Sequence, residues 1–355
     1  MALYLGIDLS TQSATAILLD GSLAPAAPAL SVNFDAAFPE YGTHAGMNQD
    51  GPVVTSPVRM WLRALDALMD RLAATGLLSR VAVVSVSGQQ HGSVYWTAKG
   101  LEALRLPAGP AGGSAFSFSA SLDEGCFALA DSPIWSDAST GAQCAALEAS
   151  LPGGAAELAD ISGSRAYCRF TGPQIAAVAE RHPAAWERTA AVSLVSSFVA
   201  SLLVGSLAPM DASDACGTNL VDWRKRRWHS PLLAAIPGLD VARLGGQPCA
   251  PHAVLGRVSP AVAARWGLPP DCAVVAASGD NPNSLAGLGV CARGDLALSL
   301  GTSTTLLGVQ EARTATPALE GHVMVLPTDA GAGTSHIYIY IYIYVERDLL
   351  WPLWR

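Results

Sequence analysis

The sequence predicts an α/β protein of two related domains that face a common cleft. Three observations support this fold class. The chain has 355 residues, which is enough for two domains of about 150 residues each. Val-rich segments with the length of buried strands alternate with segments of helical periodicity. A hairpin with a turn of small hydroxyl residues occurs twice, once at each end of the chain, and this repetition indicates two related units.

The first hairpin opens the chain. Two strands, over Tyr4–Asp8 and Ala14–Asp20, flank a small polar turn. Small residues such as Ser10 and Thr11 allow backbone N–H groups and hydroxyls to approach a phosphate. The carboxylate of Asp8 could organise Mg²⁺, directly or through water. An ordinary hairpin that carries one acidic residue is the alternative.

Apolar residues near helical spacing predict the helices of the chain. They cover Gly51–Ala74, Thr140–Ala149, Pro173–Glu180, Trp186–Leu203 and Pro260–Trp266. The segment Leu106–Ser121 is rich in Pro, Gly, Ala and Ser, and we expect it to be a surface insertion.

One uncharged stretch, Thr189–Met210, is long enough to span a bilayer. Ser193, Ser197 and Ser201 repeat within it every four residues. Such spacing places a polar stripe on one side of a helix. The stretch is therefore expected to be a buried helix of a soluble domain, in preference to a membrane span.

Two Val-rich buried strands end in polar residues. The strand Arg80–Ser87 is followed shortly by Gln90 and His91, and the strand Ala273–Ala277 by Asp280 and Asn281. A carboxylate with little water around it has a raised pKa and can take a proton from a hydroxyl. The neighbouring amides and the imidazole can read a polyol by hydrogen bonding. An Asp-Asn-Pro turn and a satisfied interior histidine are the alternatives.

The second hairpin lies at Leu296–Leu307. Its turn, Gly301-Thr302-Ser303, corresponds to Ser10-Thr11-Gln12 of the first. Two facing turns can hold the two ends of a nucleotide triphosphate. We therefore divide the chain into a first domain over residues 1–272 and a second over residues 273–329.

Residues 330–355 form an atypical low-complexity tail. Its strict Ile-Tyr alternation over Ile337–Tyr344 has the period of a β-strand. An alternating TA tract in DNA, read as codons, encodes the same repeat. We therefore hypothesise that the tail arises from a gene-model or splicing artefact, which sequencing of the transcript would test.

Composition and net charge limit the classes of molecule that the protein is expected to bind. A net charge of −8 argues against a nucleic-acid-binding surface. The seven cysteines are scattered without a Cys-x-x-Cys pair, which favours a reducing compartment, the cytoplasm. We expect no membrane partner, and the oligomeric state is left open.

Several segments then converge on a known family. The chain resembles the FGGY carbohydrate kinases, and within them it is most similar to the xylulose kinases of eukaryotes. The segments that carry the resemblance are Gly6–Gln12, Ser87–Gly92, Pro133–Asp137, Gly163–Gly172, Ser193–Phe198, Gly279–Pro282 and Ser299–Ser303.

This resemblance implies an actin-like, ribonuclease-H-like ATPase fold with a complete first domain and a partial second one. It implies ATP-dependent phosphorylation of D-xylulose to D-xylulose 5-phosphate, with Asp280 as the general base. The residues expected to bind the ketose are Gln90, His91, Arg169, Asp280 and Asn281. Those expected to line the phosphate path, with Mg²⁺ between the phosphates, are Asp8, Ser10, Thr11, Gln12, Gly301, Thr302 and Ser303.

Two departures from the family pattern bear on activity. Thr15 stands where many members carry Lys or Arg, and the adenosine site that members build after the second turn is not recognisable. We expect a truncated chain with weak or no kinase activity. The rivals are a kinase for another ketose or polyol, a non-catalytic sugar-binding remnant, and a structural member of the actin-like superfamily.

Overall fold

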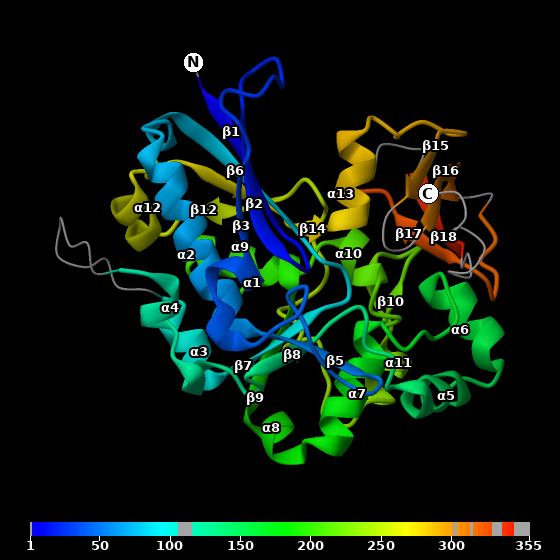
Figure 1. Cartoon of the computed structure of the whole chain (residues 1–355). Helices are drawn as coiled ribbons and strands as arrows, with labels where there is room; N and C mark the ends of the chain where they lie inside the picture. The colour runs from blue at the N-terminus through cyan, green and yellow to red at the C-terminus, as the bar shows by residue number, and fades with distance from the viewer. Residues whose placement is uncertain (1, 106–115, 301–303, 313–314, 329–335, 344–355) are drawn as a thin grey trace, which may run out of the picture.

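The computed structural model describes residues 2–105, 116–300, 304–312, 315–328 and 336–343. A seven-stranded sheet forms the centre of the larger part of the molecule, with strand order β12-β13-β6-β1-β2-β3 and with β14 also paired to β6 (Figure 1). Its strands are β1 (Leu3–Leu9), β2 (Ser13–Leu19), β3 (Leu30–Asn33), β6 (Val81–Gly88), β12 (Val254–Arg257), β13 (Ala273–Val275) and β14 (Ser278–Gly279).

Three smaller sheets and a four-stranded sheet complete the strands. The order of the four-stranded sheet is β15-β16-β18-β17. Its members are β15 (Leu296–Leu300), β16 (Thr304–Glu311), β17 (His322–Val325) and β18 (His336–Ile343). The smaller sheets join β4 (Asn48–Asp50), β5 (Val53–Pro57) and β8 (Asp131–Pro133); β7 (Ser93–Thr97) and β9 (Thr189–Leu194); and β10 (Val221–Asp222) and β11 (Arg227–Trp228).

The helices of the described residues surround these sheets. They are α1 (Phe34–Ala37), α2 (Val58–Ala74), α3 (Ala98–Ala103), α4 (Phe118–Ser121), α5 (Gly141–Ala149), α6 (Gly154–Ser162), α7 (Thr171–Arg181), α8 (Pro183–Arg188), α9 (Val195–Val204), α10 (Ala212–Cys216), α11 (Ser230–Ala234), α12 (Pro260–Trp266) and α13 (Asp280–Gly287). None of them combines the length and apolar character that a bilayer span requires.

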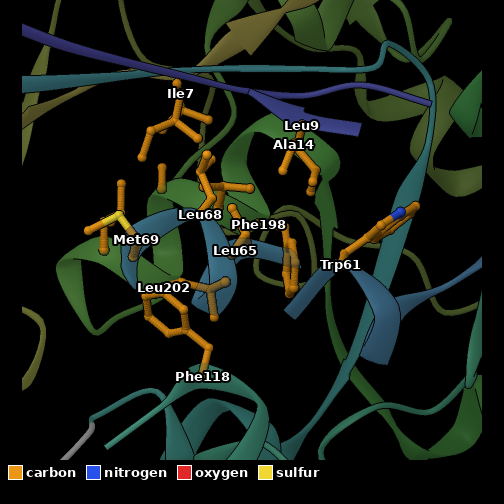
Figure 2. Close-up of a cluster of buried hydrophobic side chains, with 14 of the residues drawn as sticks. Ile7, Leu9, Ala14, Trp61, Leu65, Leu68, Met69, Phe118, Phe198 and Leu202 are labelled. Carbon is orange, nitrogen blue, oxygen red and sulfur yellow. The ribbon is translucent and has the colours of Figure 1, made fainter. Parts of the chain in front are cut away.

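The main core lies between the seven-stranded sheet and helices α2 and α9. Alternate residues of β1, such as Ile7 and Leu9, are buried, as period-two alternation requires. They meet Leu65 and Leu68 of α2 and Phe198 of α9 in one cluster (Figure 2). Because successive side chains of a strand point to opposite faces, Asp8 is turned away from this core.

The opening hairpin is confirmed, since β1 and β2 pair antiparallel across a turn at residues 10–12. The strand expected at Arg80–Ser87 is confirmed as β6, which runs parallel to β1. Helices α5, α7 and α12 match the expected ranges within two residues. In each of these elements the apolar residues follow the period of a strand or a helix closely.

Three expectations about local structure are wrong in part. The helix expected from Gly51 begins only at Val58, because the preceding residues form β5 and pair with β4 and β8. The helix expected over Trp186–Leu203 is interrupted by β9, which pairs with β7. Residues 106–115 of the expected insertion lie outside the described residues, but Phe118 within it is buried in the core.

The expected division at residues 272 and 273 stays a prediction. The seven-stranded sheet itself continues past it, because β13 and β14 both pair with β6. Part of the segment expected as a tail is a sheet strand, since β18 lies between β16 and β17 with antiparallel pairing on both sides.

Candidate active site

Three parallel strands of the central sheet bring the expected site residues together. Gly88 at the end of β6 pairs with Leu9 of β1 on one side and with Gly279 of β14 on the other. The carboxyl ends of these strands therefore meet at one edge of the sheet, which is where ligands bind in open α/β sheets. Asp8, Gln90 and Asp280 lie at this edge.

Asp280 opens helix α13 directly after β14. Its Oδ1 accepts hydrogen bonds from the backbone N–H of Asn281 at 2.8 Å and from that residue's Nδ2 at 3.1 Å. Burial, followed by the negative charge of Asp8, raises the pKa of Asp280 to about 7. A carboxyl group with a pKa near neutrality is suited to taking a proton from a hydroxyl.

The amide of Asn281 is held in place by a second contact. Its Nδ2 donates to Oε1 of Gln90 at 3.2 Å, so residues 191 positions apart form one polar surface. The Gln90 side chain is buried. The two amides and the Asp280 carboxyl together offer both donors and acceptors, as recognition of a polyol requires.

His91 has an unusual backbone and a neutral ring. Its φ is +68°, and its Nδ1 lies 2.9 Å from the carbonyl oxygen of Gly217. Burial, with the charge of Arg169 as the next cause, lowers the pKa of His91 well below its ordinary value. An Nδ1–H that donates to this carbonyl leaves Nε2 of the neutral ring as an acceptor.

Arg169 lies beside His91, at an aromatic corner. Its guanidinium carbon lies 4.6 Å from the ring centroid of Tyr167 and 5.0 Å from that of Phe170. The ring of Phe170 in turn lies 4.6 Å from that of His91. The rings of Tyr167 and Phe170 thus hold the Arg169 guanidinium next to His91.

His322 is a member of this corner that the sequence did not indicate. It belongs to β17 in the four-stranded sheet, and its ring lies 4.9 Å from that of Phe170. Burial and the charge of Arg169 lower the pKa of His322 to about 3. Phe170 thus contacts one histidine that follows β6 of the central sheet and one that opens β17 of the four-stranded sheet. No local pattern marks His322, because its strand reads as an ordinary apolar segment.

The first turn is fixed by contacts with distant segments. Trp135 donates from Nε1 to the hydroxyl of Thr11 at 2.9 Å, and the backbone N–H of Phe34 donates to the carbonyl of Gln12 at 2.9 Å. Ser10 donates to Oδ2 of Asp8. The second turn, Gly301-Thr302-Ser303, lies outside the described residues.

The remaining oxygen of Asp8, Oδ1, is buried and has no hydrogen-bond partner among the described residues. An orphaned carboxylate oxygen of this kind fits a hard cation such as Mg²⁺, which prefers few protein carboxylates and completes its shell with water and phosphate. Within the part of the chain that the structure describes, no group of three or more His, Cys, Asp or Glu side chains forms a metal site.

Asp211 and Asp214 are two further acidic residues that the sequence analysis did not single out. Both are fully buried beside β14. Burial raises the pKa of each to about 7, with the charge of Asp211 as the next cause for Asp214. In the sequence Asp211 has the position of an ordinary helix cap. No pattern in the neighbouring residues predicts that it is buried.

Comparisons with known proteins show which proteins this chain is similar to. Residues 119–287 match the N-terminal domain of the FGGY family of carbohydrate kinases. The chain is 44% identical over 333 residues to xylulose kinase 2 of Arabidopsis thaliana and 43% identical over the same length to xylulose kinase of Rattus norvegicus. Each alignment covers 92% of this chain, but the chain spans only 58% and 59% of the two relatives.

Solved structures show the same fold. The xylulose kinase from Rhodospirillum rubrum superposes with a TM-score of 0.75 at 18% identity, covering 95% of this chain and 60% of that one. Glycerol kinase from Plasmodium falciparum superposes with a TM-score of 0.76 at 14% identity, covering 97% of this chain and 61% of that one. The fold is therefore the actin-like ATPase fold of the carbohydrate kinases.

Proposed function

Because this chain belongs to the FGGY family of carbohydrate kinases, we propose that it serves ATP-dependent phosphorylation of D-xylulose to D-xylulose 5-phosphate. The observation that carries the proposal is the contact of Asp280 and Asn281 with Gln90 at the sheet edge, beside Asp8. The names of the relatives in Arabidopsis thaliana and Rattus norvegicus support D-xylulose as the sugar.

In this proposal Asp280 is the general base. Its carboxylate accepts the proton of the terminal hydroxyl as the oxygen attacks the γ-phosphorus of ATP, and ADP leaves. A pKa of about 7 keeps a large share of the group ionised at neutral pH and still makes it basic enough to accept the proton. The reaction otherwise depends on positioning and on electrostatic stabilisation, as phosphoryl transfer does in general.

The sugar would be read by the groups around Asp280. Asn281 and Gln90 supply amide donors and acceptors, and the neutral ring of His91 supplies an acceptor at Nε2. Arg169 adds a cation that the rings of Tyr167 and Phe170 hold in place. All of these residues are among those that the structure describes.

The phosphates would lie along the first turn. We assign Asp8, Ser10, Thr11 and Gln12 to this path, together with Gly301–Ser303 of the second turn. Asp8 would hold Mg²⁺ directly or through water, and the ion would neutralise charge on the phosphates. We place the reaction in the cytoplasm on the basis of the cysteine usage.

Sugar binding without catalysis is the second candidate. It is favoured by one observation: the residues that we assign to sugar recognition are held by contacts with one another and with neighbouring rings, from Asn281 to Gln90 and from Arg169 to Tyr167 and Phe170. A kinase for another ketose or polyol is the third candidate, and it differs from the first only in the sugar that it phosphorylates.

The test is formation of ADP by the purified chain with D-xylulose, D-ribulose or glycerol, alongside calorimetric titration with each sugar. Asp280→Ala is the catalytic variant, and Asp240→Asn, at an exposed position, is the control. ADP formation that needs D-xylulose and disappears with Asp280→Ala supports the proposal. Binding of D-xylulose without ADP formation favours the second candidate. If the chain neither binds D-xylulose nor forms ADP, both candidates are refuted.

A further inference from the structure

A short helix next to the site carries two buried carboxyl groups. Asp211 caps α10: its Oδ1 accepts from the backbone N–H of Asp214 at 2.9 Å and its Oδ2 from that of Ser213 at 3.1 Å. Asp214 lies within the first turn of the same helix. The exposed fractions of Asp211 and Asp214 are 0% and 1%. Burial of a carboxyl is costly, and a helix cap at the surface would avoid that cost.

Both carboxyl groups reach beyond their own helix. Ser278 of β14 donates from Oγ to Oδ2 of Asp211 at 3.2 Å. Ser196, the second residue of α9, donates from Oγ to Oδ2 of Asp214 at 2.6 Å. The two aspartates therefore connect α10 to the strand that precedes Asp280 and to the helix that covers the central sheet.

The second oxygen of Asp214 lies against the backbone of Gly279. A Cβ atom placed on Gly279 would lie 2.8 Å from Oδ1 of Asp214, 2.8 Å from Nε2 of Gln90 and 2.4 Å from its Cγ. Such distances are too short for a real side chain, so Asp214 and Gln90 enclose this glycine closely. The opposite end of the Gln90 amide accepts from Nδ2 of Asn281.

These contacts form a chain that ends at the proposed reacting groups. Asp211 accepts a hydrogen bond from Ser278. Asp214 and Gln90 together enclose Gly279, and Gln90 accepts a hydrogen bond from Asn281. The residues fixed in this way are the two immediately before Asp280 and the one immediately after it. The same helix is joined to the four-stranded sheet, because Ser213 donates from Oγ to the carbonyl of Val325 in β17 at 2.6 Å.

We propose that Asp214, assisted by Asp211, is a positioning residue that fixes Gly279 and Gln90 and thereby aims Asp280 and Asn281 at the sugar. The proposal rests on the proposed function for the identity of the sugar. It does not make Asp214 a catalytic residue, because its contacts are with Ser196, Gly279 and Gln90. A helix cap that served stability alone would need Asp211 but not Asp214.

The test compares Asp214→Ala, Asp214→Asn and the matched control Asp66→Ala. Asp66 is a partly buried carboxyl that, like Asp211, accepts two backbone N–H bonds, from Phe118 at 2.7 Å and Ser119 at 3.0 Å. The N–H groups that it accepts from belong to α4, which packs against α2. Asp214→Asn keeps the shape and one acceptor oxygen, so it is the conservative variant.

Two readouts are measured on the purified chain. The first is hydrogen exchange of the peptide that contains Ser278 to Asn281, without sugar. The second is the Kd for D-xylulose by calorimetry. We expect Asp214→Ala to speed exchange in this peptide and to weaken sugar binding by about tenfold, which is the scale of one buried hydrogen bond. Asp214→Asn should restore most of both, and Asp66→Ala should lower the melting temperature without changing either.

The outcomes separate the two proposals. If Asp214→Ala leaves exchange of this peptide as in the wild type, or if Asp66→Ala changes it equally, the positioning role is refuted. If the wild type fails to bind D-xylulose while Asp214→Ala still loosens the peptide, the proposed sugar is wrong and the positioning role stands.

Discussion

Replacing Asp214 by asparagine should flatten the dependence of the protein's stability on pH. The side chain is fully buried, and burial together with the charge of Asp211 raises its pKa from 3.8 to about 7. Between these two values the folded chain holds a proton on Asp214 that the unfolded chain releases. The free energy of unfolding therefore falls as pH rises through this window.

The magnitude follows from the size of the shift. A group that is protonated only in the folded state changes the free energy of unfolding by about −1.4 kcal/mol per pH unit. From about pH 4.5 to about pH 8, Asp214 thus accounts for a loss of about 3 kcal/mol. Asparagine cannot titrate, so this part of the loss disappears. The change also removes a negative charge that raises the pKa of Asp280, and this further reduces the pH dependence of the unfolding free energy. Asp211 still titrates in the variant.

Urea unfolding monitored by tryptophan fluorescence measures the effect, since the chain has nine tryptophans. The informative quantity is the difference in unfolding free energy between Asp214→Asn and the wild type at each pH, because groups common to both cancel. Asp50→Asn, at an exposed position, controls for the loss of one carboxyl. A difference that stays constant from acid to neutral pH would show that Asp214 does not titrate in this window.

Two further substitutions test the packing of the site. Gly279→Ala should lower the free energy of unfolding by about 1–3 kcal/mol, because its Cβ would lie 2.4 Å from Cγ of Gln90 and 2.8 Å from Oδ1 of Asp214; wild-type stability in a urea titration would contradict this. Trp135→Phe removes the donor to Thr11 at 2.9 Å and should cost about 1 kcal/mol. In a double-mutant cycle with Thr11→Val the two losses should not add, and full additivity would exclude the hydrogen bond.

The sequence predicted the part of the fold that depends on local pattern. Alternation in β1 and β2, the small residues between them and the Val-rich run of β6 are each sufficient to specify their element. Once β1, β6 and β14 are read as strands that end at one edge, Asp8, Gln90 and Asp280 must lie close together. The polar strand ends were therefore visible without a structure, and the resemblance to the FGGY carbohydrate kinases supplied the roles of Asp280 and its amide neighbours.

The segment Thr189–Leu194 shows where that approach fails. Its residues, Thr-Ala-Ala-Val-Ser-Leu, continue an apolar run that also fits a helix. What makes it a strand is pairing with β7, which lies about a hundred residues earlier in the chain. Ser193 is also placed by this pairing, and its Oγ accepts the indole N–H of Trp96 at 2.9 Å. A short-range pattern does not contain this information.

The proposed sugar-binding residues His91 and Arg169 lie in surroundings to which the four-stranded sheet contributes, and for this reason the sequence alone left this part of the site incomplete. Phe170 packs between His91, which follows β6, and His322, which opens β17. The backbone N–H of Val323 donates to the carbonyl of Gly163 at 2.9 Å, just upstream of Arg169. The four-stranded sheet therefore supports the aromatic corner that holds Arg169. A change in β17 should consequently affect binding of the proposed sugar, even though no residue of that strand is among those that we assign to sugar binding.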